Sequence, residues 1–125
     1  MLLGIGTDIL WIERLRPALE RRDSAFFSAV YTPAEWAEGA KRPDPLRYYA
    51  TRFAGKEAVY KCLGRQEGEV RLSEIEILSD AFGAPTVALS GGCLCRARAL
   101  DVERIEISLS YDHEYAQAFA AAMGK

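Results

Sequence analysis

The chain has 125 residues, of which 50% are hydrophobic and 27% charged, and its formal net charge is −2 at pH 7. This length suits one domain with a modest core, and the composition is typical of a globular protein in water. The acidic balance argues against general nucleic-acid binding, which usually needs a basic domain. We therefore expect a single domain over residues 1–125.

The cysteines and the N-terminus indicate a cytoplasmic protein. Cys62, Cys93 and Cys95 lack the spacing of a disulfide framework or a zinc knuckle, so we expect reduced thiols. The N-terminus carries no basic leader and soon reaches Asp8, unlike a signal peptide. No apolar run is long enough to span a membrane.

The first predicted element is a buried strand over residues 2–9. Gly4 and Gly6 alternate with apolar residues there, which indicates that another segment approaches the strand closely. Asp8 stands at or near the end of this strand. An acid in that position is often the N-cap of the next helix, so capping is one interpretation of Asp8.

Residues 11–22 are expected to be helical, in two short pieces because Pro17 interrupts the pattern. Arg14, Arg21 and Arg22 share one side at helical spacings. Spacing alone favours a solvated face for them. The alternative is a docking surface for an acidic partner.

Two short helices follow. Asp23 and Ser24 can begin the first of them, and Thr32, Pro33 and Glu35 form a clear start signal for the second, which ends near Gly39. Residues 41–45 are polar and proline-rich and predict a turn.

A long helix is predicted over residues 46–64, with Asp44 as a cap and Gly64 as its end. At about 100° per residue, Glu57 falls in the middle of an apolar face, and Lys61 follows one turn later. That face consists of Leu46, Ala50, Phe53, Ala54, Tyr60 and Gly64. A carboxylate there is unfavourable unless something pairs with it.

After a polar loop over residues 65–69, the pattern predicts a hairpin of strands 75–78 and 86–89, a helix within 90–100, and strands over 104–111 and 115–123. The many alanines of the last segment also allow a helix. The fold class is α+β, with a mainly antiparallel sheet packed on the long central helix.

Asp8 and Glu57 would approach each other if the first strand packs on the long helix. A Mg²⁺ ion would relieve the repulsion between the two carboxylates, and Lys61 nearby would suit a phosphate oxygen. The alternative is a capping role for Asp8 together with an ion pair between Glu57 and Lys61 within the helix. Spacing alone favours this second interpretation.

Several motifs resemble the short bacterial holo-acyl-carrier-protein synthases, the group-I 4′-phosphopantetheinyl transferases. They are residues 4–9 (GIGTDI), 52–61 (RFAGKEAVYK), 75–77 (IEI), 83–85 (GAP), 108–110 (SLS) and 114–116 (EYA). The resemblance covers nearly the whole chain. It implies transfer of the 4′-phosphopantetheine arm of coenzyme A to a serine of an apo acyl carrier protein, with release of 3′,5′-ADP. It also implies a homotrimer with active sites at subunit interfaces, and a role in fatty acid biosynthesis.

The resemblance also assigns roles to residues. Asp8 and Glu57 match the Mg²⁺ ligands, and Lys61 matches a lysine that contacts the phosphates, so these three are the expected catalytic residues. The expected coenzyme A contacts are Arg52, Lys61, Gly64, Gly83, Pro85, Ser110 and Tyr111. In the family, the region that meets the acidic carrier protein corresponds to the segment with Arg14, Arg21 and Arg22. The resemblance therefore favours a docking surface over a solvated face for these arginines.

Three positions depart from the family pattern. Tyr111 stands where a histidine is common, Ala84 where the turn often carries a basic residue, and Gly55 where alanine or serine is usual. His113 lies two residues after Tyr111. A tyrosine hydroxyl does not replace imidazole as a base near neutral pH, which leaves Glu57 as one candidate base. The alternatives are a degenerate homologue that binds coenzyme A or carrier protein with weak or no transfer, and a purely structural trimer.

Overall fold

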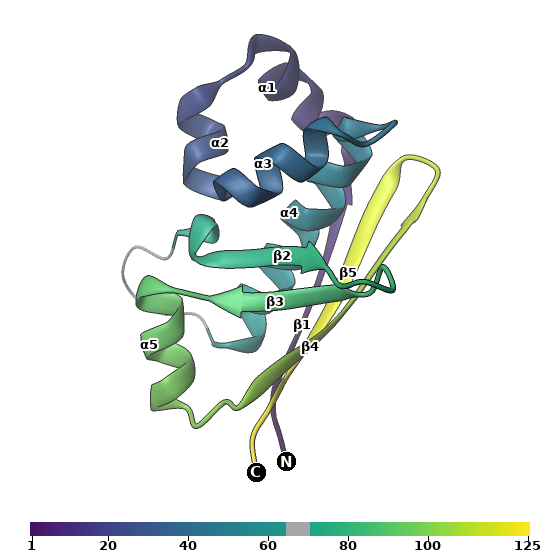
Figure 1. Cartoon of the computed structure of the whole chain (residues 1–125). Coiled ribbons are helices and arrows are strands. Elements are labelled where there is room, and N and C mark those ends of the chain that lie inside the picture. Colours follow the sequence, from purple (N-terminus) through teal and green to yellow (C-terminus); the bar gives the residue numbers. More distant parts are fainter. Residues whose placement is uncertain (65–70) are drawn as a thin grey trace.

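The computed structural model describes residues 1–64 and 71–125, so the expected loop over residues 65–69 lies outside the described residues. The long helix α4 (Pro45–Cys62) runs through the middle of the molecule. Figure 1 shows a three-stranded sheet on one side of α4 and a two-stranded hairpin on the other, with three short helices gathered at one end. This arrangement confirms the predicted α+β fold class.

The described elements are β1 (Leu2–Trp11), the 3-10 turn η1 (Ile12–Leu15), α1 (Arg16–Arg21), α2 (Ser24–Val30), α3 (Pro33–Ala40), α4 (Pro45–Cys62), the 3-10 turn η2 (Leu72–Glu74), β2 (Ile75–Ser79), β3 (Pro85–Leu89), α5 (Gly91–Ala99), β4 (Arg104–Asp112) and β5 (Tyr115–Met123). One sheet has the strand order β1-β5-β4 and the other pairs β2 with β3. Every pairing is antiparallel, as predicted.

The helices begin where local capping chemistry predicts. The Asp23 carboxylate accepts a hydrogen bond from the Phe26 backbone N–H at 3.1 Å, and Asp44 caps α4 in the same way at 3.1 Å. Thr32 and Glu35 form a capping box at the start of α3. These caps satisfy backbone donors that have no partner inside the helix.

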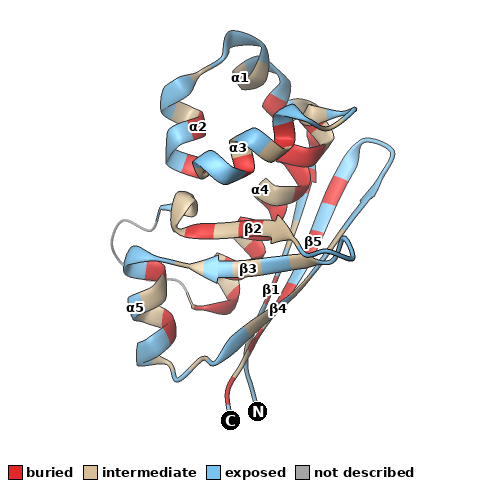
Figure 2. Cartoon of the chain, viewed as in Figure 1, coloured by how far each residue is buried: buried red, intermediate tan, exposed pale blue. Residues whose placement is uncertain are grey.

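Strand β5 is a strand despite its alanines. Its even positions, Ala116, Ala118, Ala120 and Ala122, are buried, whereas Tyr115 and Phe119 between them are exposed. This alternation is visible along β5 in Figure 2. Small side chains on the inner face allow the sheet to lie close to α4, so tertiary packing rather than helix propensity decides the conformation.

Strand β1 also lies directly against α4, as the two glycines predict. A Cβ atom added to Gly6 would lie 2.0 Å from the Ala58 carbonyl oxygen, and one added to Gly4 would lie 2.1 Å from the Cys62 carbonyl oxygen. No other residue type fits at these positions unless the backbone moves.

We expect Gly6→Ala to lower the free energy of unfolding by about 1–3 kcal/mol, because the added methyl group overlaps a helix carbonyl that cannot turn away. Urea unfolding measures the loss. Gly55→Ala is the matched control, since a Cβ there meets only side-chain ends, those of Ile77, Leu109 and Ile107 at 2.7, 2.9 and 3.2 Å. Equal losses in the two variants would contradict a rigid contact between β1 and α4.

All three cysteines are free, as expected. Burial raises the pKa of Cys62 and of Cys93 to about 11, so both thiols stay protonated at neutral pH. Within residues 1–64 and 71–125, no helix has the length and apolar character needed to cross a membrane.

Candidate active site

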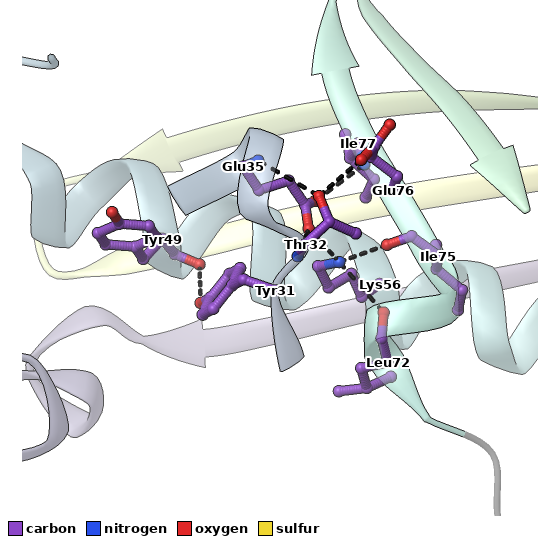
Figure 3. A network of polar contacts seen from close by, with 9 residues as sticks. All are labelled: Tyr31, Thr32, Glu35, Tyr49, Lys56, Leu72, Ile75, Glu76 and Ile77. Atoms are coloured by element: carbon purple, nitrogen blue, oxygen red, sulfur yellow. Dashed lines mark hydrogen bonds and ion pairs between the residues drawn. The ribbon is translucent and has the colours of Figure 1, made fainter. Parts of the chain in front are cut away.

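The buried charge of α4 is Lys56, not Glu57. The side chains of Lys56 and Glu35 are fully buried, with Nζ 2.7 Å from Oε1 of the carboxylate. Figure 3 shows Nζ also pointing toward the carbonyl oxygens of Leu72, at 3.1 Å, and Ile75. Lys56 therefore adds no exposed positive charge beside the site. It neutralises Glu35 inside the protein and ties α3 and the start of β2 to α4.

The predicted apolar face of α4 is only partly correct. Ala50 and Ala54 are buried, but Phe53 and Tyr60 are half-buried, and so is Glu57. Because α4 lies between two sheets, its buried residues occupy more than one face. They are Leu46, Tyr48, Tyr49, Ala50, Thr51, Ala54, Gly55, Lys56, Ala58, Val59 and Cys62.

Asp8 lies within β1 rather than at its end. It pairs with Ala118 in the strand register, and the residue that precedes the next helical turn is Trp11, so Asp8 is not a helix cap. Residues two apart share one face of a strand, and Asp8 therefore stands on the same face as Gly4 and Gly6, the face that meets α4. Its side chain is 18% exposed.

Lys61 reaches from α4 to β1. Its Nζ lies 3.3 Å from Oδ1 of Asp8 and donates a hydrogen bond to the Thr7 carbonyl oxygen at 2.9 Å. Lys61 thus forms an ion pair with Asp8. Since Lys61 follows Glu57 by one helical turn, Asp8 meets α4 beside the turn that carries Glu57.

The donor chemistry at this point fits Mg²⁺. The described residues contain no group of three or more histidine, cysteine, aspartate or glutamate side chains that could hold a metal ion. Two carboxylates, from Asp8 and Glu57, are a normal protein contribution to a Mg²⁺ site, because this ion usually keeps several waters or binds substrate phosphates as well. The partial exposure of both residues leaves room for such ligands.

A cavity of about 320 Å³ lies between the start of α4, the tip of the β2–β3 hairpin and the end of β4. Its lining residues are Arg42, Pro43, Asp44, Arg47, Tyr48, Thr51, Arg52, Gly83, Pro85, Leu109, Ser110 and Tyr111. Five of the expected coenzyme A contacts, Arg52, Gly83, Pro85, Ser110 and Tyr111, meet here although they come from distant parts of the sequence. Gly64, at the other end of α4, is not among the lining residues; its φ of +77° explains why a glycine ends the helix.

The cavity is electropositive, because three guanidinium groups line it against the single carboxylate of Asp44. Arg47 stacks 4.2 Å from the ring centre of Tyr111, and Arg52 stacks 4.2 Å from that of Tyr48. Planar guanidinium groups are well suited to phosphate oxygens. Sequence reasoning found Arg52 but missed Arg42 and Arg47. Arg47 and Arg52 are five residues apart on α4, so no i,i+3 or i,i+4 spacing indicated that both would line one cavity.

Residues 4–121 match the family model described as the 4′-phosphopantetheinyl transferase superfamily. The chain belongs to this superfamily. It is 43% identical to the holo-[acyl-carrier-protein] synthase of Shewanella amazonensis over 119 residues, which cover 94% of this chain and 95% of that protein.

Solved structures of superfamily members share the fold. The holo-ACP-synthase of Plasmodium yoelii superposes with a TM-score of 0.86 at 34% identity, covering 100% of this chain and 97% of that one. The holo-[acyl-carrier-protein] synthase of Helicobacter pylori, solved in complex with coenzyme A, gives a TM-score of 0.81 at 26% identity, covering 95% and 99%.

The arginines expected to meet the carrier protein do not share one helix face. Arg14 lies in η1, Arg21 ends α1, and Arg22 is the left-handed residue that follows it, with φ of 52°. The predicted common face relied on helical spacing across Pro17, where the structure changes from the 3-10 turn η1 to α1. All three residues are nevertheless exposed, near the same end of the molecule.

Proposed function

We propose that this chain transfers the 4′-phosphopantetheine arm of coenzyme A to a serine hydroxyl of an apo acyl carrier protein and releases 3′,5′-ADP, with residues 1–125 forming one transferase domain. The observation that carries the proposal is the arginine-lined cavity, in which residues of three separate motifs meet, namely Arg52, Gly83 with Pro85, and Ser110. Similarity to holo-[acyl-carrier-protein] synthases over nearly the whole chain supports it.

In this reaction the cavity binds the charged nucleotide end of coenzyme A. Arg42, Arg47 and Arg52 offer paired N–H donors to phosphate oxygens, an interaction stronger than a neutral hydrogen bond. Lys61 stands at the Asp8 carboxylate and is the residue that would contact the phosphates on that side. Gly83 and Pro85 supply a turn without bulky side chains beside the nucleotide.

Asp8 and Glu57 are the residues that would hold Mg²⁺. When bound, the ion supplies positive charge that offsets the diphosphate. The serine must also lose its proton, and Glu57 is the candidate base because a half-buried carboxylate at the site can accept it.

We further propose that the active form is a homotrimer. Ile5, Ile9 and Trp11 of β1 and Tyr115 and Phe119 of β5 are exposed large apolar side chains on the outer face of the three-stranded sheet. Contiguous apolar surface of this kind marks an interaction site. Sedimentation equilibrium would give three times the chain mass, and a stable monomer at micromolar concentration would contradict the trimer.

We place the enzyme in the cytoplasm and in fatty acid biosynthesis. The three free cysteines are compatible with a reducing compartment.

Charge reversal at Arg14 and Arg21 is expected to raise the KM for the carrier protein about 10-fold, because an acidic partner loses complementary charge. The affinity for coenzyme A should change little, since neither residue lines the cavity. Arg98→Glu on α5 is the control, an equally exposed arginine near the opposite end of the molecule. Equal losses for carrier and coenzyme A would count against docking at this surface.

The reaction itself is tested by following release of 3′,5′-ADP from coenzyme A in the presence of Mg²⁺. Release that requires apo carrier protein supports the transferase. Binding of coenzyme A without release, across several carriers and divalent metals, would instead favour a homologue that only binds coenzyme A or the carrier.

A further inference from the structure

Two buried polar atoms in the wall of the arginine-lined cavity make no hydrogen bond within the described residues. They are the hydroxyl oxygen of Tyr48 and Nε of Arg52. Tyr48 is only 4% exposed, so solvent does not readily satisfy its hydroxyl group. Unpaired buried polar groups are uncommon because they lose their bonds to water and gain nothing in exchange.

Packing explains the Tyr48 ring but not its hydroxyl group. The ring lies against two guanidinium groups, with Arg52 at 4.2 Å and Arg42 at 5.0 Å from its centre. A phenylalanine ring would make the same stacking contacts. The hydroxyl oxygen therefore makes no hydrogen bond that would account for its presence in the free protein.

Two neighbouring tyrosines, by contrast, have hydroxyl groups with protein partners. Tyr49 donates to the Trp36 carbonyl oxygen at 3.0 Å, and Tyr31 donates to the Tyr49 carbonyl oxygen at 2.6 Å. Burial also raises the pKa of Tyr48, so its hydroxyl group stays protonated and can donate a hydrogen bond at neutral pH.

The surrounding arginines can rearrange when an anion enters. Arg42 is held by an ion pair to Glu38 at 3.2 Å in which both side chains are 38% exposed. Arg52 donates to the Ser79 hydroxyl group at 3.0 Å, a neutral partner. A phosphate oxygen accepts hydrogen bonds without donating any, and it would compete well for both guanidinium groups.

We infer that the Tyr48 hydroxyl group and Arg52 Nε are donors to a phosphate group of coenzyme A, which reaches them as Arg42 and Arg52 turn toward the ligand. This inference rests on the proposed function and adds Tyr48 to the substrate-binding residues. Tyr48 then binds substrate through its oxygen atom and positions the two arginines through its ring.

Tyr48→Phe tests the inference, because it removes the oxygen atom and keeps the ring. We expect the Kd for coenzyme A, measured by titration calorimetry with the full chain, to rise about 10-fold. We expect the melting temperature of the free protein to stay the same or increase, because an unsatisfied hydroxyl group is removed. Tyr49→Phe is the matched control, with a lower melting temperature and unchanged coenzyme A affinity, because its hydroxyl group has a protein partner.

A Tyr48→Phe variant that binds coenzyme A as tightly as the wild-type protein would overturn the inference and leave the proposed function intact. A fall in melting temperature alongside weaker binding would also overturn it, because that pattern indicates a structural role. If the wild-type protein neither binds coenzyme A nor modifies a carrier, the proposed function itself fails, and the two failures are thus distinguishable.

Discussion

Glu57→Gln is expected to lower the rate of phosphopantetheine transfer by about 10²–10³-fold, the size of effect seen when a group that stabilises transition-state charge is lost. Glutamine has nearly the same shape as glutamate but lacks the negative charge that holds Mg²⁺ and the basicity that accepts a proton. Because Glu57 is half-buried, whereas Lys56 and Glu35 form the buried ion pair, the fold should survive the change.

The control for this variant is Glu103→Gln, the same chemical change at an exposed residue outside the proposed site. Transfer rates and thermal melting curves should be measured for both proteins. Activity close to wild type in Glu57→Gln would remove Glu57 from its assigned role. A large drop in its melting temperature would show that the residue supports the fold instead.

Lys56→Met is expected to reduce the free energy of unfolding by about 3–5 kcal/mol, because it leaves the Glu35 carboxylate buried without a countercharge. The carbonyl oxygens of Leu72 and Ile75 lose a donor at the same time. Figure 3 shows that these contacts connect α3, α4 and the start of β2. Urea unfolding followed by circular dichroism measures the loss.

Adding Glu35→Gln to Lys56→Met separates charge from packing. The Thr32 and Ile77 backbone N–H groups donate to the two carboxylate oxygens of Glu35 at 2.9 Å each. The single amide oxygen of glutamine can still accept from one of them, whereas its NH2 group cannot accept from the other. The double variant should therefore recover part of the lost stability, because the buried charge is gone. No recovery would indicate that the uncompensated charge is not the cause of the loss.

Local chemistry explains what was predictable in the fold. Asp23, Thr32 and Asp44 cap their helices as expected because a cap depends on residues within one turn. Gly4 and Gly6 similarly indicated the close contact of β1, since only a neighbouring backbone requires two alternating glycines in a strand. The hairpins also followed from short-range alternation.

The incorrect predictions concern residues whose environment depends on contacts between segments that are distant in the sequence. The expectation for Glu57 assumed that α4 has one buried face, but two sheets cover it. The buried ion pair of Lys56 and Glu35 was not predicted, because the two residues are 21 apart in the sequence and Glu35 was interpreted only as part of a helix start. Asp8 was expected near a strand end because the pattern did not reveal the full length of β1.

The candidate site was predictable mainly from motifs. Spacing alone favoured a capping role for Asp8, whereas Asp8 pairs with Lys61 of α4. The cavity residues come from α4, the β2–β3 turn and β4, and no local pattern connects these segments. Arg42 and Arg47 were missed for the same reason. Nothing in the neighbouring sequence distinguishes either residue from an ordinary surface arginine, and only the folded structure places both in the cavity wall.

The most direct test of the account is the intact mass of an apo acyl carrier protein after incubation with this protein, coenzyme A and Mg²⁺. The carrier is expected to gain the mass of one 4′-phosphopantetheine arm, located on a serine, and Glu57→Gln is expected to produce no such gain. The transferase function would be contradicted if carrier proteins of both the fatty-acid and the polyketide type remained unmodified, with Mg²⁺ and with other divalent metals.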